Sequence, residues 1–153
     1  MMVNDKKRLG LRWNSGQTLV EFAISLLTFL VLVFAIIDFS YLFFVKLTLQ
    51  NAVRQAGRYA ITGQSMTGQS RFNSIQQTVQ HYSMGLATTT NTSICATVKG
   101  CSSGGGPGDT VTITVSYPYQ FITPILRAAF KNGTYTISVT TSYKNEPFPP
   151  GQT

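Results

Sequence analysis

The feature that most constrains this chain is a long apolar run near its N-terminus. Residues 22–37 are sixteen consecutive uncharged residues, and after Asp38 the run continues to Val45. A helix of these 24 residues, at about 1.5 Å each, reaches roughly 36 Å, enough to cross a hydrocarbon core of about 30 Å with some tilt. A cleaved secretory signal has a shorter apolar core and a small-residue site after it, which the first turns of this run lack. We therefore predict a membrane-spanning helix over residues 17–45.

A basic leader and a glycine precede the run. Residues 1–16 contain four basic side chains and end at Gly16, and Glu21 follows five positions later at the mouth of the run. Ionisable groups at membrane depth are costly and usually functional. The segment from Gly16 to Glu21 therefore indicates three events together: processing of the chain, insertion of the apolar run into a membrane, and assembly with other subunits.

Asp38 is the second acid of the run. It lies seventeen residues after Glu21 and about 100° round the helix from it, so the two carboxylates do not form one site. We expect Asp38 near the outer membrane interface. Two environments are compatible with this carboxylate: solvation at the membrane interface, or a contact with another helix.

The orientation of the span follows from charge and from cysteine content. The leader is basic, but Lys46, Arg54 and Arg58 follow the run, so the positive-inside bias is small. Two downstream cysteines favour an oxidising compartment for the C-terminal domain. We expect the N-terminus inside and residues 46–144 outside the membrane.

The remainder predicts a small α+β domain. Helical spacing of apolar residues continues over 46–62 and returns over 72–82, so one helix should run from about Thr18 to Thr62 and a second should follow. Apolar residues alternate with polar ones over 94–98, 111–117 and 135–143, which predicts about three strands. Thr123 and Pro124 open a short helix to Lys131. The tail, 145–153, contains three prolines and should be irregular.

The two cysteines bracket five residues. A disulfide between Cys95 and Cys101 would contribute on the order of 2 kcal/mol by the chain-entropy relation. Metal binding would need a second pair of ligands, and the single His81 has no recognisable spacing to the cysteines. We favour the disulfide over free or metal-bound thiols and expect no metal site and no cofactor.

Side chains for catalysis are scarce beyond the run. The available carboxylates are Asp109 and Glu146, each beside a turn or tail where solvated charges are ordinary. Residues 104–108, rich in glycine, lack the strand, helix and lysine of a phosphate-binding loop. An enzyme is not expected. The formal charge of +7 is scattered, so nucleic acid is not an expected partner and a solvated surface is the better interpretation.

The residues from Gly16 to Ala60 resemble TadE-like proteins, the minor pilins or pseudopilins of bacterial tight-adherence (Flp) pilus systems. The similarity is carried by Gly16, Val20-Glu21-Phe22-Ala23, Ile36-Ile37-Asp38-Phe39 and the stretch from Gln50 to Ala60. Such proteins often have a proline a few residues into the run, where this chain has Leu27. The resemblance covers about 45 of the 153 residues.

The resemblance implies a site and a set of partners. A prepilin peptidase would cut between Gly16 and Gln17, and Glu21 would be the family's acid five positions after the cut. The amine of Gln17 could then pair with Glu21 of a neighbouring subunit, with Phe22 and Asp38 also in the assembly helix. The implied partners are the peptidase, inner-membrane platform proteins, and major and sister minor pilins. The implied location is the bacterial inner membrane, with the cell surface or pilus possible, and the implied roles are pilus assembly or priming, secretion and cell adhesion.

An alternative comes from another class of protein. A single-pass anchored binding protein could contact surface polymer or DNA without joining a filament, and the scattered bases and seven tyrosines permit this. Copurification with pilus components would distinguish the two.

Overall fold

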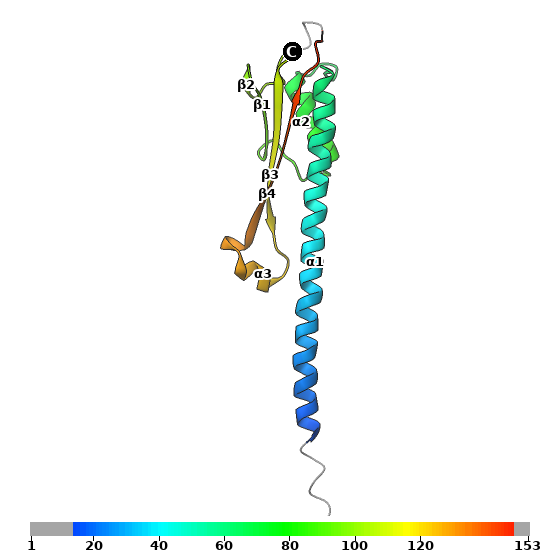
Figure 1. Ribbon diagram of the computed structural model, residues 1–153, viewed down its shortest axis with the longest axis vertical. Coiled ribbons are helices and arrows are strands. Elements are labelled where there is room, and N and C mark those ends of the chain that lie inside the picture. The colour runs from blue at the N-terminus through cyan, green and yellow to red at the C-terminus, as the bar shows by residue number, and fades with distance from the viewer. Residues whose placement is uncertain (1–13, 149–153) are drawn as a thin grey trace, which may run out of the picture.

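The computed structural model describes residues 14–148, and Figure 1 shows one long helix with a small domain along its upper half. Helix α1 runs from Asn14 to Ile61 without a break. It confirms the continuous helix expected over Thr18–Thr62. Residues 1–13, which hold the four basic side chains of the leader, and the last five residues of the tail lie outside the described residues.

The upper half of α1 is held by α2, which spans Arg71–Tyr82. The side-chain oxygen of Ser70 accepts the N–H of Asn73 and caps this helix. Ile75 and Val79 of α2 are fully buried in the core. The buried face of α1 includes three alanines, whose small side chains let a neighbouring element approach closely: Ala52, Ala56 and Ala60.

An antiparallel sheet completes the α+β fold expected from the sequence. Its strands are β1 (Thr92–Ala96), β2 (Gly100–Cys101), β3 (Thr110–Gln120) and β4 (Thr134–Lys144), in the order β2-β1-β3-β4. Alternate residues of the central strands enter the core: Ile94, Ala96, Val111, Ile113 and Val115. The alternation of apolar residues correctly located β1, β3 and β4.

Two strand details differ from the expectation. The first strand ends at Ala96, and Val98 lies in a turn with 81% of its surface exposed. The turn is held by Asp109, whose Oδ1 accepts the Val98 N–H at 3.1 Å. The turn leads into β2, whose two residues are too short to show any alternation of apolar side chains.

Residues 121–133, the β3–β4 connector, contain α3 (Pro124–Ala129) and the short 3₁₀ turn η1 (Lys131–Gly133). The connector lies beside the middle of α1 in Figure 1. The expected helix from Pro124 to Lys131 is shorter in the structure, because Phe130 is extended and stacks on Phe121 with the ring centroids 4.4 Å apart. Thr123 is the N-cap residue, but its side chain makes no capping hydrogen bond.

Arg71, expected among the solvated bases, is buried instead. Its Nη1 donates to the Gly105 carbonyl at 2.7 Å and its Nη2 donates to the Ala60 carbonyl, while its guanidinium lies 4.4 Å from the centre of the Phe148 ring. A cation here also complements the C-terminal end of α1. Burial lowers the pKa of Arg71, and the charge of Asp109 opposes that shift.

Asp109 is also buried, which corrects the expectation of a solvated turn residue. Its Oδ1 accepts the N–H groups of Val98 and Thr110 at 3.1 and 2.9 Å. Asp109 therefore ties the turn after β1 to the start of β3. Glu146, the other distal acid, is exposed as expected.

Candidate functional site

The first turns of α1 bring Gln17 and Glu21 together. The Gln17 Nε2 donates to Glu21 Oε1 at 3.1 Å, one helical turn away. Both residues are exposed, and so is Phe22. A Cβ added at Gly16 would have no neighbour within 4 Å. Nothing in the described part of the chain therefore covers this junction sterically.

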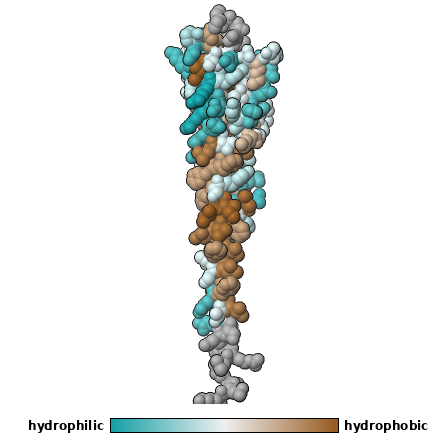
Figure 2. Space-filling view, turned by 90° about the vertical axis from the view of Figure 1, so that its right-hand side faces the viewer, coloured by the Kyte–Doolittle hydropathy of each residue, from teal (hydrophilic) through white to brown (hydrophobic). Residues whose placement is uncertain are grey.

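The helix above this junction presents apolar side chains outward in all directions. Fourteen of the sixteen residues from Phe22 to Ile37 are exposed, and Val33 and Ala35 are half-buried. By its length and composition, α1 is able to cross a membrane. In the view of Figure 2, hydrophobic residues gather over the middle of the molecule and continue down one side below it, whereas hydrophilic residues predominate in the upper part. This segment needs lipid or neighbouring subunits to cover it.

Asp38 ends the exposed segment and is only 1% exposed. Its Oδ1 accepts the Ile122 N–H at 2.8 Å, and its Oδ2 accepts the Thr123 N–H at 2.9 Å. These two N–H groups precede the first turn of α3, so the carboxylate fixes the start of this helix without replacing the cap that the Thr123 side chain does not form. Of the two alternatives left open for Asp38, burial contradicts solvation, whereas the bond from Thr123, the N-cap residue of α3, is a contact at the start of another helix. The partner of Asp38 is the backbone of the connector.

Tyr119, near the end of β3, adds a third bond to Asp38. Its hydroxyl donates to the Asp38 backbone carbonyl at 3.1 Å, and the ring is buried. Burial raises the pKa of Tyr119, and the negative charge of Asp38 raises it further. Asp38 is therefore bound to the connector by its side chain and to the end of β3 by its backbone carbonyl.

A continuous series of aromatic contacts follows from this point. Tyr119 lies 5.8 Å from Tyr41 and 5.3 Å from Phe121, measured between ring centroids. The series extends to Phe44 at the α1 end and through Phe130 to Tyr135 at the connector end. It passes from α1 across the lower end of the sheet at the level where the exposed apolar segment ends.

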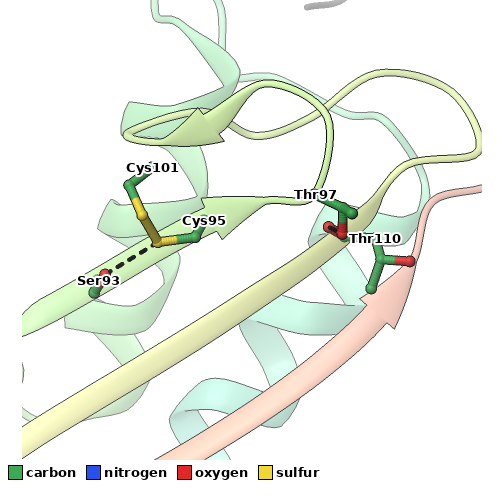
Figure 3. The surroundings of a disulfide bond; sticks show 5 residues. All are labelled: Ser93, Cys95, Thr97, Cys101 and Thr110. Atoms are coloured by element: carbon green, nitrogen blue, oxygen red, sulfur yellow. Dashed lines mark hydrogen bonds between the residues drawn. A yellow bond between two sulfur atoms is a disulfide. The ribbon is translucent and has the colours of Figure 1, made fainter.

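The cysteines lie at the other end of the domain. Cys95 of β1 and Cys101 of β2 are register partners, and a disulfide joins them with an S–S distance of 2.07 Å (Figure 3). The Ser93 hydroxyl lies 3.4 Å from the Cys95 sulfur on the same strand. The bond closes the hairpin that contains Val98.

No constellation for catalysis or metal binding forms within residues 14–148. No three His, Cys, Asp or Glu side chains converge in this part of the chain. A surface groove of about 710 Å³ lies between α1 and α2. Its lining combines aromatic rings with amide side chains, among them Tyr59, Tyr82, His81, Gln55 and Gln77. Such a groove offers hydrogen bonds and ring contacts for binding.

The structure thus brings some of the predicted residues together and separates others. Gln17 and Glu21 are in contact, as are Cys95 and Cys101. Asp38 is separate from Glu21 and joins Ile122, Thr123 and Tyr119, which the sequence reasoning did not connect to it. The Thr123-Pro124 helix start was the available sequence signal, because an N-terminus needs acceptors for its N–H groups.

Comparison with known families supports the resemblance seen in the sequence. Residues 16–58, which form most of α1, match the model of the TadE-like protein family. Comparisons with curated proteins and with solved structures gave no match. The family comprises structural proteins associated with the Tad pilus and is not an enzyme family. The similarity to the TadE-like family is therefore carried by the N-terminal helix of this chain.

Proposed function

We propose that this protein is a minor pilin or pseudopilin of a bacterial Tad (Flp) pilus or secretion system. A prepilin peptidase removes residues 1–16, α1 enters the inner membrane, and the domain remains outside. The protein then acts in pilus assembly or priming and in surface adhesion. Its partners are inner-membrane platform proteins and the major and sister minor pilins. The observation that carries the proposal is the family match on a helix whose first half is uncovered by the rest of the chain.

Access to the junction supports processing. Gly16 is exposed at the start of α1, with open space around the position of a Cβ. A peptidase needs to open only the first turn of the helix, where the first backbone N–H groups have no helical partners. The rest of α1 is unaffected by that opening.

The geometry of Glu21 supports a role in assembly. One of its oxygens accepts the Gln17 side chain, and a carboxylate has further lone pairs for another donor. Cleavage would place a positive amine on Gln17. In a low-dielectric environment, burial of either charge alone is costly, whereas pairing of Glu21 with the Gln17 amine of a neighbour fixes the stagger of the two subunits.

Two variants test processing and assembly separately. Gly16→Ala should leave the precursor uncut, while Ser25→Ala, a small change higher in α1, should be cut normally. Glu21→Gln should be cut but should enter pili poorly, and Glu146→Gln, the matched change at an exposed distal acid, should assemble. Immunoblots of precursor and mature forms, with sheared pilus fractions, measure both. A wild-type chain that stays uncut in cells with active prepilin peptidase would refute the processing step.

The groove between α1 and α2 favours one alternative, a membrane-anchored binding protein that never joins a filament. Rings and amides in one groove suit a surface polymer such as a polysaccharide. Crosslinking in cells distinguishes the two functions. A pilin-like subunit should be recovered with a platform protein or another pilin, whereas an anchored binding protein should be recovered without them.

A further inference from the structure

We propose that the β3–β4 connector is a second membrane contact, seated at the outer interface of the bilayer beside α1. The occupant of its exposed surface is lipid. This inference rests on the insertion of α1, which belongs to the proposed function. The proposed contact adds the connector, which is remote in sequence from α1, to the part of the protein that touches lipid.

The first argument is the depth of the connector. Ile122, Thr123 and Pro124 line a groove of about 320 Å³ together with four residues of α1. Those four residues are all apolar and all belong to the uncharged run: Leu27, Leu30, Val31 and Phe34. If this run lies among acyl chains, the start of the connector lies beside them.

The second argument is the backbone of the connector. Irregular backbone near the hydrocarbon layer is tolerated only where its polar groups have partners. Asp38 accepts the N–H groups of Ile122 and Thr123. The Arg127 N–H donates to the Thr123 carbonyl, and the Gly133 N–H donates to the Phe130 carbonyl. The buried acid thus has a physical reason to lie at this level, since it supplies acceptors where water is scarce.

The third argument is the side-chain composition. Ile122 is 65% exposed, and Phe130 of the connector and Tyr135 at the start of β4 are exposed too. Residues 121–133 contain Arg127 and a lysine but no acid. Aromatic and apolar side chains with a few bases are the usual composition of an interfacial segment, where bases meet lipid phosphates.

The exposed face of β3 and β4 differs from the connector. On this face the two strands carry paired hydroxyls, Thr112 with Ser142, Thr114 with Thr140 and Ser116 with Ser138. The face stays mainly polar up to the last register pair, Gln120 with Thr134. The apolar surface is therefore confined to the connector, and its continuity with the spanning helix favours lipid over a second protein as the occupant.

The test uses the full chain in vesicles of phosphatidylcholine and phosphatidylglycerol. Trp13→Phe removes the single tryptophan, and Ile122→Trp then places one on the connector. Val98→Trp is the aqueous control, at an exposed turn in the upper domain, and Phe29→Trp is the membrane control, at an exposed position within the uncharged run. The Cys95–Cys101 disulfide, checked by mass, reports that each variant has folded. Quenching is measured with brominated phosphatidylcholine and with aqueous acrylamide.

We expect brominated lipid to quench Ile122→Trp several-fold more strongly than Val98→Trp. Equal quenching of Ile122→Trp and Val98→Trp, with Phe29→Trp strongly quenched, would overturn the connector's membrane contact while leaving the insertion of α1 intact. Protection of Ile122→Trp from both quenchers would also overturn the membrane contact of the connector. That result would indicate that a second copy of the chain covers the connector. If Phe29→Trp itself escapes quenching, both the inference and the proposed insertion fail.

Discussion

Asp38 and Thr123 are 85 residues apart in the chain, yet the Asp38 carboxylate accepts the Thr123 backbone N–H at 2.9 Å. With the bond to Ile122, this contact joins the middle of the long helix to the far end of the sheet. Seven residues of the expected spanning segment, 39–45, follow this attachment point, and Val45 is already part of the domain core. The attachment therefore lies at the boundary between the uncovered and the packed halves of α1.

Replacement of Asp38 should destabilise the domain. Asp38→Ala leaves the partly buried N–H groups of Ile122 and Thr123 without acceptors, and a fully buried group of this kind costs about 1–3 kcal/mol. We expect the free energy of unfolding to fall by about 2 kcal/mol or more. Urea denaturation of the detergent-solubilised chain, followed by near-ultraviolet circular dichroism, measures this. Glu21→Ala, an exposed acid on the same helix, is the control, and equal stability of the two variants would contradict the role of Asp38.

The stability of the domain should fall at high pH because of Tyr119. Its pKa is raised from an ordinary value near 10, first by burial and then by the charge of Asp38. Between the unfolded and the folded pKa, only the folded state holds the proton, so the contribution is complete below about pH 10 and is lost as the pH rises through the folded pKa. Denaturation midpoints across this range measure the effect.

Tyr119→Phe is the matched control for this pH dependence. It removes the titrating hydroxyl and its hydrogen bond to Asp38, a loss of about 1 kcal/mol at neutral pH. The variant should lose less stability than the wild type above pH 10. Parallel pH profiles for the two proteins would show that Tyr119 does not titrate as proposed.

Gly57→Ala should destabilise the protein, although the same change in an exposed helix interior gains up to about 1 kcal/mol. A Cβ at this position would lie 2.0 Å from Cε2 of Tyr143 on β4. The ring must move, and forced repacking of this kind costs about 1–3 kcal/mol. Thermal unfolding measures the loss.

A second substitution checks the cause of that loss. Tyr143→Leu shortens the opposing side chain, so the double variant should recover part of the stability lost by Gly57→Ala, relative to Tyr143→Leu alone. Additive losses in the two single variants and the double variant would exclude a steric conflict between these residues.

The disulfide should stabilise the hairpin of β1 and β2. Replacement of Cys95 and Cys101 by serine should lower the free energy of unfolding by about 2 kcal/mol, because the short loop gains freedom mainly in the unfolded chain. Reduced wild type should match the double variant in urea denaturation, and oxidised wild type should exceed both. If reduction leaves the wild-type midpoint unchanged, the bond does not contribute.

Sequence patterns predicted the elements that have a clear period. The helix from Thr18 to Thr62, the second helix and three of the strands were located by their apolar spacing alone. The two-residue strand β2 escaped because it is too short for a period and is defined by its pairing with β1. The predicted strand position of Val98 was wrong for a related reason, since the turn there depends on pairing with β2 and on the bond from the Val98 N–H to the distant Asp109 side chain.

The candidate site likewise has some features that the sequence predicted and others that it did not. Gly16, Glu21 and the apolar run are neighbours along the chain, so their order and helical spacing were readable from the sequence, as was the resemblance to TadE-like proteins. The cleavage between Gly16 and Gln17 remains a prediction. The partners of Asp38 and the burial of Arg71 were not readable, because both depend on contacts between segments far apart in the chain.

The sequence by itself therefore determined the long helix, its uncovered apolar half and the acid at its start, because these depend on local spacing and on the hydrophobicity of consecutive residues. Only the tertiary structure decided the role of Asp38. Its charge and position in the run are compatible with water, lipid headgroups or another helix. Burial became stable when folding brought the N–H groups of Ile122 and Thr123 within hydrogen-bonding distance, since a buried carboxylate needs donors that only the folded chain supplies.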